Sequence, residues 1–201
     1  MLISGVEVAS QSISSKKDGA FTGEISAEQV KDFGLKWTLV GHSERRTLYG
    51  ETNEVVAAKV QRAQEAGLSA IVCIGETLEI REAGTTNEVL KQQLDAVKPS
   101  ITDWSRIVIA YEPVWAIGTG KVATPEIAQE THAYIRSWLS AEVSPAVANA
   151  TRIQYGGSAT AANVGALIVM PDIDGFLVGG ASLKPEFCDI IKIAHSHYSG
   201  H

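Results

Sequence analysis

Six short runs rich in apolar and β-branched residues recur along the chain, and a stretch with helical spacing follows each of them. Most of these runs are continuously apolar, which is typical of strands covered on both faces of a parallel sheet. The predicted strands are residues 6–10, 37–43, 70–76, 106–113, 152–158 and 175–182. The pattern therefore predicts an α/β fold, with about six βα units in a single domain over residues 1–201.

Helix start and stop signals separate the predicted strands. Thr124 followed by Pro125 is a typical helix start, Ser26 is a second capping residue, and Gly34 and Gly67 stand where two helices should end. The predicted helices are residues 26–34, 52–67, 85–100, 124–143, 160–169 and 184–197.

The strand ends favour a barrel over a doubly wound open sheet. Polar residues and glycines gather after strand upon strand: Gly41-His42-Ser43, Gly75-Glu76, Glu112, Gly156-Gly157-Ser158 and Gly179-Gly180. A (β/α) barrel builds its active site at these carboxyl ends. Neither a G-x-G-x-x-G after the first strand nor a P-loop is present, which argues against a nucleotide-binding open sheet.

Composition narrows the function classes. The chain is 45% hydrophobic and 20% charged with a net charge of −6, which is globular and unlike a nucleic-acid-binding protein. No apolar run is long enough for a membrane span and no basic leader is visible, so we expect a cytoplasmic protein. Cys73 and Cys188 are expected to be buried free thiols, and no metal-ligand spacing is seen.

Glu112 ends the fourth predicted strand, within the stretch AYEPVWAIGTGK at residues 110–121. The acid is flanked by Tyr111, Pro113 and Trp115, and apolar surroundings raise the pKa of a carboxylate and make it a usable base. A strand-end glutamate paired with an arginine is the alternative.

The loop after Glu112 has a rigid start at Pro113 and two glycines, Gly118 and Gly120, near its end. A loop of this kind can close over a substrate as a lid and exclude water. An ordinary βα connection is the alternative.

His42 ends the second predicted strand in the sequence GHSERR. The N-terminus of the following helix can hold an imidazole neutral, and a neutral imidazole can polarise a carbonyl or shuttle protons. A hydrogen-bonded structural histidine is the alternative. Glu44 could cap the helix or belong to the site, while Arg45 and Arg46 are expected to be surface ion-pair partners.

Two Gly-Gly pairs, in YGGS (155–158) and VGGAS (178–182), end the last two predicted strands. Consecutive backbone N–H groups beside a helix N-terminus can cradle a phosphate without a cation. One such pair could be only a tight turn, but two on consecutive strands favour a phosphate site.

Together these stretches resemble the triose-phosphate isomerase family, from Val6 to about Ile191. AYEPVWAIGTGK is similar, residue for residue, to the family's catalytic-base and lid signature. GHSERR, CIGE, YGGS, DGFLVGGASLKP and GAFTGEIS are similar to further family motifs, in the family's order.

The resemblance implies a (β/α) TIM barrel, a homodimer without cofactor or metal, and interconversion of dihydroxyacetone phosphate and glyceraldehyde 3-phosphate in glycolysis and gluconeogenesis. It also implies that Glu112 moves a proton between adjacent carbons. His42 would polarise the carbonyl and shuttle protons between the oxygens of the enediol(ate). These roles come with the resemblance, because this family is itself the standard example of a glutamate base beside a neutral histidine under a closing loop.

Further residues are implied in the same way. The family's phosphate-holding positions are matched by Gly118, Ser158, Gly179 and Gly180. Ser43 and Glu44 match positions that support the catalytic histidine. The loop at residues 11–25 matches a dimerisation loop that reaches into the partner's active site, with Thr22 near its tip.

The family's barrel has eight strands, whereas six are predicted here. The first of them, VEVASQ, resembles the family's third, so the first two βα units and their asparagine–lysine pair are expected to be missing. Lys16, Lys17 and Lys121 do not stand at strand ends, where they could replace that lysine.

Three functions stay open at this point. The chain could be a triose-phosphate isomerase that is incompletely recorded or completed by another chain. It could be a truncated, non-catalytic isoform or pseudoenzyme that pairs with full-length subunits. A different phosphate-handling barrel, such as a lyase, is disfavoured because the lid signature and GHSERR occur together.

Residues 1–201 expressed alone are predicted to be poorly soluble and inactive or nearly so. The apolar strands 6–10 and 175–182 would be unpaired edges, which promote aggregation. Loss of one contact to a developing oxyanion commonly costs about 10²–10³ in rate. Size-exclusion chromatography and an isomerisation assay with glyceraldehyde 3-phosphate test this prediction. A soluble, cooperatively melting species with family-like turnover would contradict it.

Overall fold

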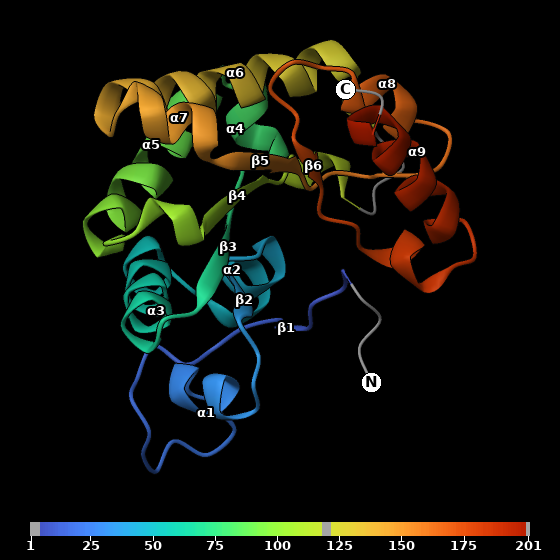
Figure 1. The fold of residues 1–201 in the computed structure, drawn as a ribbon. Coiled ribbons are helices and arrows are strands. Elements are labelled where there is room, and N and C mark those ends of the chain that lie inside the picture. Colours follow the sequence, from blue (N-terminus) through green and yellow to red (C-terminus); the bar gives the residue numbers. More distant parts are fainter. Residues whose placement is uncertain (1–4, 118–121, 200–201) are drawn as a thin grey trace. The chain divides into compact units, whose positions relative to one another are not determined.

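The computed structural model describes residues 5–117 and 122–199 (Figure 1). The chain divides into two compact units, which are described separately. The first unit comprises Met1–Ile74 and Lys91–Val108, and the second comprises Gly75–Leu90 and Ile109–His201.

The described residues contain six strands, and their order in the sheet is their order in the chain, β1-β2-β3-β4-β5-β6. The strands are β1 (Ala9–Ser10), β2 (Trp37–Val40), β3 (Ser69–Ile74), β4 (Ile107–Tyr111), β5 (Arg152–Tyr155) and β6 (Gly175–Phe176). A doubly wound sheet reverses its order at a switch point, and this order does not reverse. The predicted α/β class and barrel-type strand order are therefore confirmed.

The strand pairs within each unit are parallel. In the first unit Ala9 pairs with Trp37, and Trp37 in turn pairs with Ser69. In the second unit Tyr155 of β5 pairs with Phe176 of β6. Parallel pairing places the carboxyl ends of neighbouring strands at one edge, where the predicted site residues follow them.

All six strands are shorter than predicted, because several of the residues assigned to their ends belong to turns, helices or irregular segments. Ser43 already begins a helix, and Gly180 begins a 3₁₀ turn. Val6 and Val8 precede β1 and are exposed. The apolar pattern thus located each strand but overestimated its length.

The helices follow the strands as the βα pattern predicts, and α2 is the helix expected after His42, while two short helices (α4 and α7) were not predicted separately. They are α1 (Ala27–Asp32), α2 (Ser43–Tyr49), α3 (Asn53–Ala66), α4 (Leu78–Glu82), α5 (Thr86–Val97), α6 (Pro125–Glu142), α7 (Pro145–Ala150), α8 (Val164–Ile168) and α9 (Phe187–Ser199). The 3₁₀ turns are η1 (Lys98–Ser100), η2 (Trp104–Arg106), η3 (Val114–Ala116) and η4 (Gly180–Leu183).

The predicted helix starts are confirmed by their caps. The Ser26 hydroxyl accepts the Gln29 backbone N–H at 3.0 Å, and the Gln29 side chain accepts the Ser26 N–H at 2.9 Å. Thr124 accepts the N–H of Ile127 at 3.3 Å at the start of α6. Each bond satisfies a backbone group that the first helical turn leaves without a partner.

Buried apolar side chains hold each unit together. In the first unit, Val56 and Val60 of α3 are buried beside strands β2 and β3, and Figure 1 shows α3 alongside β3. In the second unit, Ile135 and Leu139 of α6 are buried, as is Ile153 of β5. Strand β4 is buried at every position, as its continuously apolar sequence predicted.

The prediction of two buried thiols is half wrong. Cys73 in β3 is buried, but Cys188 in α9 is exposed. Helix α9 packs through Phe187, Ile190 and Ile193, which repeat at helical spacing, and Cys188 lies outside that stripe.

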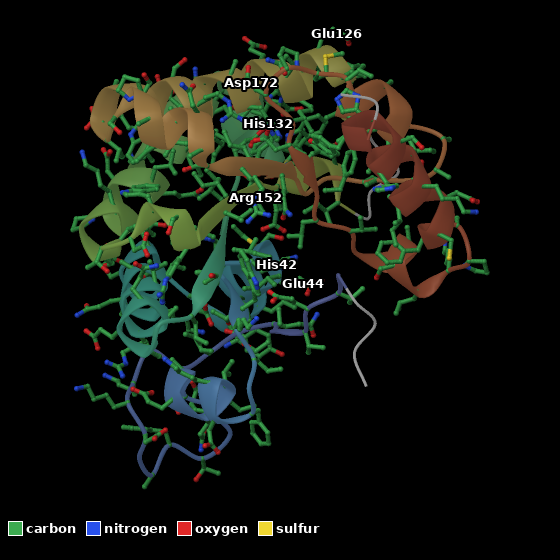
Figure 2. The ribbon with its side chains drawn as sticks, viewed as in Figure 1. His42, Glu44, Glu126, His132, Arg152 and Asp172 are labelled. Atoms are coloured by element: carbon green, nitrogen blue, oxygen red, sulfur yellow. The ribbon has the colours of Figure 1, made fainter. Side chains whose placement is uncertain are left out.

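A buried histidine and an arginine join α6 to the segment before β6. Nδ1 of His132 lies 3.0 Å from the backbone oxygen of Asp172, to which it donates (Figure 2). Arg136 binds Asp172 and Asp174 through two contacts of 2.6 Å each. Burial, as the largest cause, lowers the pKa of His132 from 6.5 to about 4, although the bond to Asp172 acts in the opposite direction.

Acidification should destabilise the protein through His132. Its folded pKa is below its unfolded value, so between pH 6.5 and 4 the unfolded chain binds a proton that the folded chain does not. The free energy of unfolding should therefore fall as the pH drops through this window, by up to about 1.4 kcal/mol per pH unit. Urea unfolding of the protein made from its complete coding sequence measures this slope.

His132→Gln should flatten that slope, whereas the matched change at exposed His195 in α9 should leave it unaltered. Equal slopes in both variants would show that His132 is not the titrating group.

Candidate active site

Glu112 directly follows β4 and is only 1% exposed. The strand that carries it is fixed by burial along its whole length. The structure thus places a carboxylate at the carboxyl end of an apolar strand, as the sequence predicted.

Strand β5 passes very close to Glu112. The N–H of Gly156 donates to the backbone oxygen of Tyr111 at 2.7 Å. A Cβ atom at position 156 would lie 2.9 Å from Cγ of Glu112 and 3.1 Å from the Tyr111 oxygen. Only glycine allows this approach, so Gly156 forms a wall against the side chain of the acid.

A second buried acid, Glu76, anchors the residues on either side of Glu112. Its Oε1 accepts the Tyr111 hydroxyl at 3.0 Å and Trp115 Nε1 at 2.9 Å. Arg81 of α4 donates to the same oxygen at 3.3 Å and lies 5.2 Å from the centre of the Trp115 ring. Glu112 therefore lies between two residues that share one acceptor.

The hydroxyl of Tyr111 stays protonated and acts as a donor in this cluster. Burial first, and then the negative charge of Glu76, raise the pKa of Tyr111 far above its usual range. The Tyr111 hydroxyl therefore remains a hydrogen-bond donor across the pH range in which proteins work.

The described part of the predicted lid is an ordered turn. Pro113 precedes η3, and the N–H of Val114 donates to the backbone oxygen of Glu76 at 3.1 Å. The N–H of Ala116 donates to the oxygen of Pro113 at 2.8 Å. Gly118, predicted to bind phosphate, and the other lid residues up to 121 lie outside the described residues.

The remaining predicted phosphate residues follow β5 and β6. Ser158 comes three residues after Tyr155, and Gly179 comes three residues after Phe176, which is the strand partner of Tyr155. Gly179 and Gly180 are exposed, and no atom outside their chain neighbours lies within 4 Å of a Cβ built at either position. Their backbone is thus open to a ligand, in the same unit as Glu112.

His42 lies in the first unit, where it caps α2. Its Nδ1 accepts the backbone N–H of Glu44 at 3.2 Å, and both side chains are labelled in Figure 2. A ring nitrogen that accepts such a bond carries no proton, so this bond assigns the ring proton to Nε2.

The neighbours of His42 only partly follow the predictions. Ser43 is buried, whereas the Glu44 side chain is 73% exposed and its Oε2 lies 3.9 Å from Nδ1. Arg45 forms its expected ion pair, at 2.7 Å, although its partner Glu51 is buried. The surface role predicted for Arg46 is wrong: this residue donates to the Gly41 backbone oxygen at 2.8 Å, because it folds back on the end of β2.

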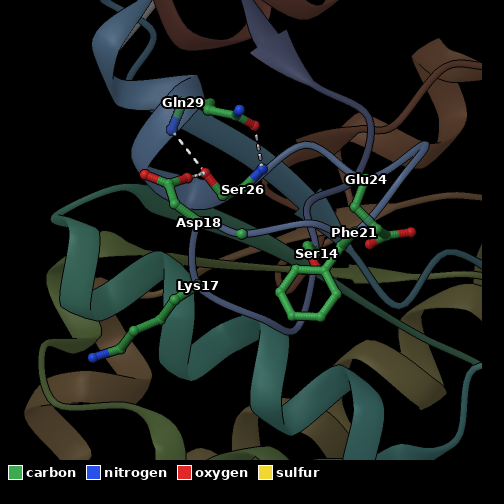
Figure 3. A pocket seen from close by; sticks show the side chains of 8 residues that line it. Ser14, Lys17, Asp18, Phe21, Glu24, Ser26 and Gln29 are labelled. Atoms are coloured by element: carbon green, nitrogen blue, oxygen red, sulfur yellow. Dashed lines mark hydrogen bonds between the residues drawn. The ribbon is translucent and has the colours of Figure 1, made fainter.

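The loop at residues 11–25 is closed at its base, where the Ser14 N–H donates to the Ile25 oxygen at 2.8 Å. Thr22, near its tip, is exposed. Ser14, Asp18 and Ser26 help to line a small cavity beside this loop (Figure 3). Its volume of about 20 Å³ admits a single water molecule and excludes a triose phosphate.

The predicted residues thus fall into two groups. Glu112, Ser158, Gly179 and Gly180 belong to the second unit. Thr22, His42, Ser43 and Glu44 belong to the first unit. Over residues 5–117 and 122–199, no set of three or more His, Cys, Asp or Glu side chains could hold a metal ion, and no helix combines the length and the apolar character needed to cross a membrane.

Comparison with known proteins identifies the family. The family model for triosephosphate isomerase matches residues 1–194. The chain belongs to the triosephosphate isomerase family. It is 58% identical over 189 residues to the cytosolic triosephosphate isomerase of Oryza sativa subsp. japonica, and the match covers 94% of this chain and 75% of the relative.

Membership of the triosephosphate isomerase family confirms the resemblance and the TIM-barrel fold class. It also removes the different phosphate-handling barrel from the open functions.

Sequence reasoning missed the anchoring cluster. Glu76 stood out only as a polar strand end, and Tyr111 and Trp115 only as neighbours of the acid. The available signal was the order of these residues along the chain. Glu76 follows one buried strand, and the aromatic donors Tyr111 and Trp115 stand on either side of the acid that follows the next strand. Arg81 had no such signal, because only the fold of α4 brings it to Glu76.

Removing the Glu76 carboxylate should destabilise the protein. Glu76→Ala leaves the Tyr111 hydroxyl, the Trp115 indole and the Arg81 guanidinium without their acceptor, at a cost of about 3 kcal/mol in the free energy of unfolding. Glu76→Gln keeps an acceptor oxygen and should cost much less. Equal losses in the two variants, measured by urea unfolding, would show that these hydrogen bonds do not stabilise the site.

Proposed function

We propose that Glu112 is the base, and His42 the electrophile, of the reaction that defines the chain's family. That reaction interconverts dihydroxyacetone phosphate and glyceraldehyde 3-phosphate by proton transfer through an enediol(ate). The reaction follows from family membership, which makes the protein an intramolecular aldose–ketose isomerase of glycolysis and gluconeogenesis. The observation that carries the assignment is the buried carboxylate of Glu112, held at a strand end between two anchored residues.

Glu112 meets the requirements of a base that removes a proton from carbon. Such a base must be held at a defined position, because small displacements of a catalytic group reduce the rate strongly. Tyr111 and Trp115 are hydrogen-bonded to Glu76, and Gly156 packs so closely against the Glu112 side chain that a Cβ atom would not fit between them. The carboxylate takes the proton from one carbon of the substrate and returns it to the adjacent carbon.

His42 supplies a hydrogen-bond donor for the substrate oxygens. The bond from the Glu44 N–H to Nδ1 leaves the proton on Nε2, which can donate to a substrate carbonyl. A donor aimed at the oxygen where negative charge develops stabilises the enediolate. The same nitrogen can pass its proton from one oxygen to the next. Ser43 and Glu44 support the histidine from the first turn of α2.

The phosphate of the substrate binds to Ser158 and to the backbone N–H groups of Gly179 and Gly180, with Gly118 of the lid as a further donor. The exposed glycine backbone after β6 and the parallel pairing of β5 with β6 support this assignment. When the lid closes, it excludes water, so the enediolate keeps its phosphate. No cofactor takes part in this scheme.

The active enzyme is a homodimer in the cytoplasm. The exposed loop tip at Thr22 supports the dimer. The cytoplasm is inferred from the similar rice protein, whose name gives it as cytosolic. Residues 1–201 belong to a single, partial TIM-barrel domain in this proposal. Neither a nucleic acid nor a membrane is a partner.

The alternative is a truncated, non-catalytic isoform that pairs with full-length subunits. It is not favoured, because the family model and the 58% identity to a triosephosphate isomerase both extend over most of the chain.

Replacing the base tests the assignment. In the protein made from its complete coding sequence, Glu112→Gln should lower kcat by at least about 10³-fold, because the amide keeps the shape of the side chain but cannot accept the proton. Triose phosphate should still bind, with KM changed only a few-fold. Glu130→Gln, at an exposed position in α6, is the matched control and should keep normal turnover. Near-normal kcat in Glu112→Gln would remove Glu112 from the mechanism.

A further inference from the structure

We infer that Gly75 is a positioning residue for the reaction: its lack of a side chain sets the place of the Glu112 backbone. The inference rests on the proposed role of Glu112 as the base. Gly75 directly follows β3, whereas Glu112 directly follows β4, and both belong to the second unit.

The contact between the two residues is very close. A Cβ atom at position 75 would lie 1.8 Å from the backbone oxygen of Glu112, 2.8 Å from its carbonyl carbon and 3.3 Å from its Cα. Real Cβ atoms almost never approach another atom within 3.0 Å. All three neighbours belong to the backbone of the acid, so no flexible side chain can turn away to make room.

Packing, rather than backbone conformation, requires glycine here. Gly75 is absent from the glycines with a positive φ, so it is not held in the left-handed region that favours glycine. A methyl group would instead push against Glu112. To restore 3.0 Å from 1.8 Å, the two backbones must separate by more than 1 Å.

The next residue along the chain makes this displacement consequential. Glu76 holds Tyr111 and Trp115 through its side chain, and Val114 through its backbone oxygen at 3.1 Å. Gly75 and Glu76 thus define the place of the base by contact and by hydrogen bonds, respectively. A shift between Gly75 and Glu112 cannot relax freely, because the flanking residues stay tied to Glu76.

The expected cost follows from the geometry of proton transfer. A displacement of about 1 Å at a catalytic group can reduce turnover by about 10²-fold. The residues proposed to bind phosphate after β5 and β6 do not touch Gly75 in this contact. Gly75→Ala should therefore lower kcat by about 10²-fold and change KM by no more than about 3-fold.

A double-mutant cycle separates placement of the base from general damage. Gly75→Ala is made in the protein from its complete coding sequence, alone and together with Glu112→Ala. If Gly75 acts by placing Glu112, it should have almost no further effect on the residual kcat once the carboxylate is gone. Gly165→Ala in α8 is the control, because its Cβ would meet only Ile193, at an ordinary 3.8 Å, and it should keep normal kcat.

Each result decides the matter. A 10²-fold loss in kcat that disappears in the Glu112→Ala background supports the inference. Normal kcat in Gly75→Ala, or the same fractional loss in both backgrounds, overturns it. Failure of Gly75→Ala to fold, seen as loss of a cooperative thermal transition, also overturns it, since Gly75 would then serve the stability of the sheet. If Glu112→Gln keeps its turnover, the proposed function fails and this inference fails with it, whereas the preceding results leave the function intact.

Discussion

The site in the second unit depends on one buried acceptor, the Oε1 atom of Glu76. It receives hydrogen bonds from the residue before Glu112 and from the third residue after it, and Arg81 supplies the compensating positive charge. A buried carboxylate is costly unless its charge is paired and its oxygens accept hydrogen bonds. Here the hydrogen bonds and the contact with Arg81 are all made by Oε1, which joins the end of β4 to the start of the lid. Glu76 thereby defines the place of Glu112, the proposed base.

The sequence predicted the elements of the fold well, for reasons that the structure makes clear. Strand β4 is apolar at every position because it is buried at every position, and α6 starts at Thr124 and Pro125 because these residues cap and begin a helix. Both signals are local, so a linear sequence carries them in full. The lengths of strands β2, β5 and β6 were overestimated, because the glycines and polar residues that follow an apolar run need not pair with the neighbouring strand. The composition of the run does not mark the residue at which this pairing stops.

The site was predicted where its signals are local and missed where they are not. The position of Glu112 after a buried strand and the helix that follows His42 could be read from consecutive residues. The approach of Gly75 to Glu112, the return of Arg46 to Gly41 and the exposure of Cys188 depend on which residues the folded chain brings together. A side chain's neighbours follow from strand register and helix rotation, and the order of residues does not give these directly.

The two glycines that pack against Glu112 limit which substitutions the chain can accept during evolution. Every amino acid other than glycine brings a Cβ atom, so positions 75 and 156 have no substitute that keeps both neighbouring backbones where they are. An exposed position such as Glu130, by contrast, has many acceptable replacements. Substitutions should therefore accumulate at positions around Gly75 and Gly156, but not at these two glycines. Both should remain glycine in every related protein that retains Glu112.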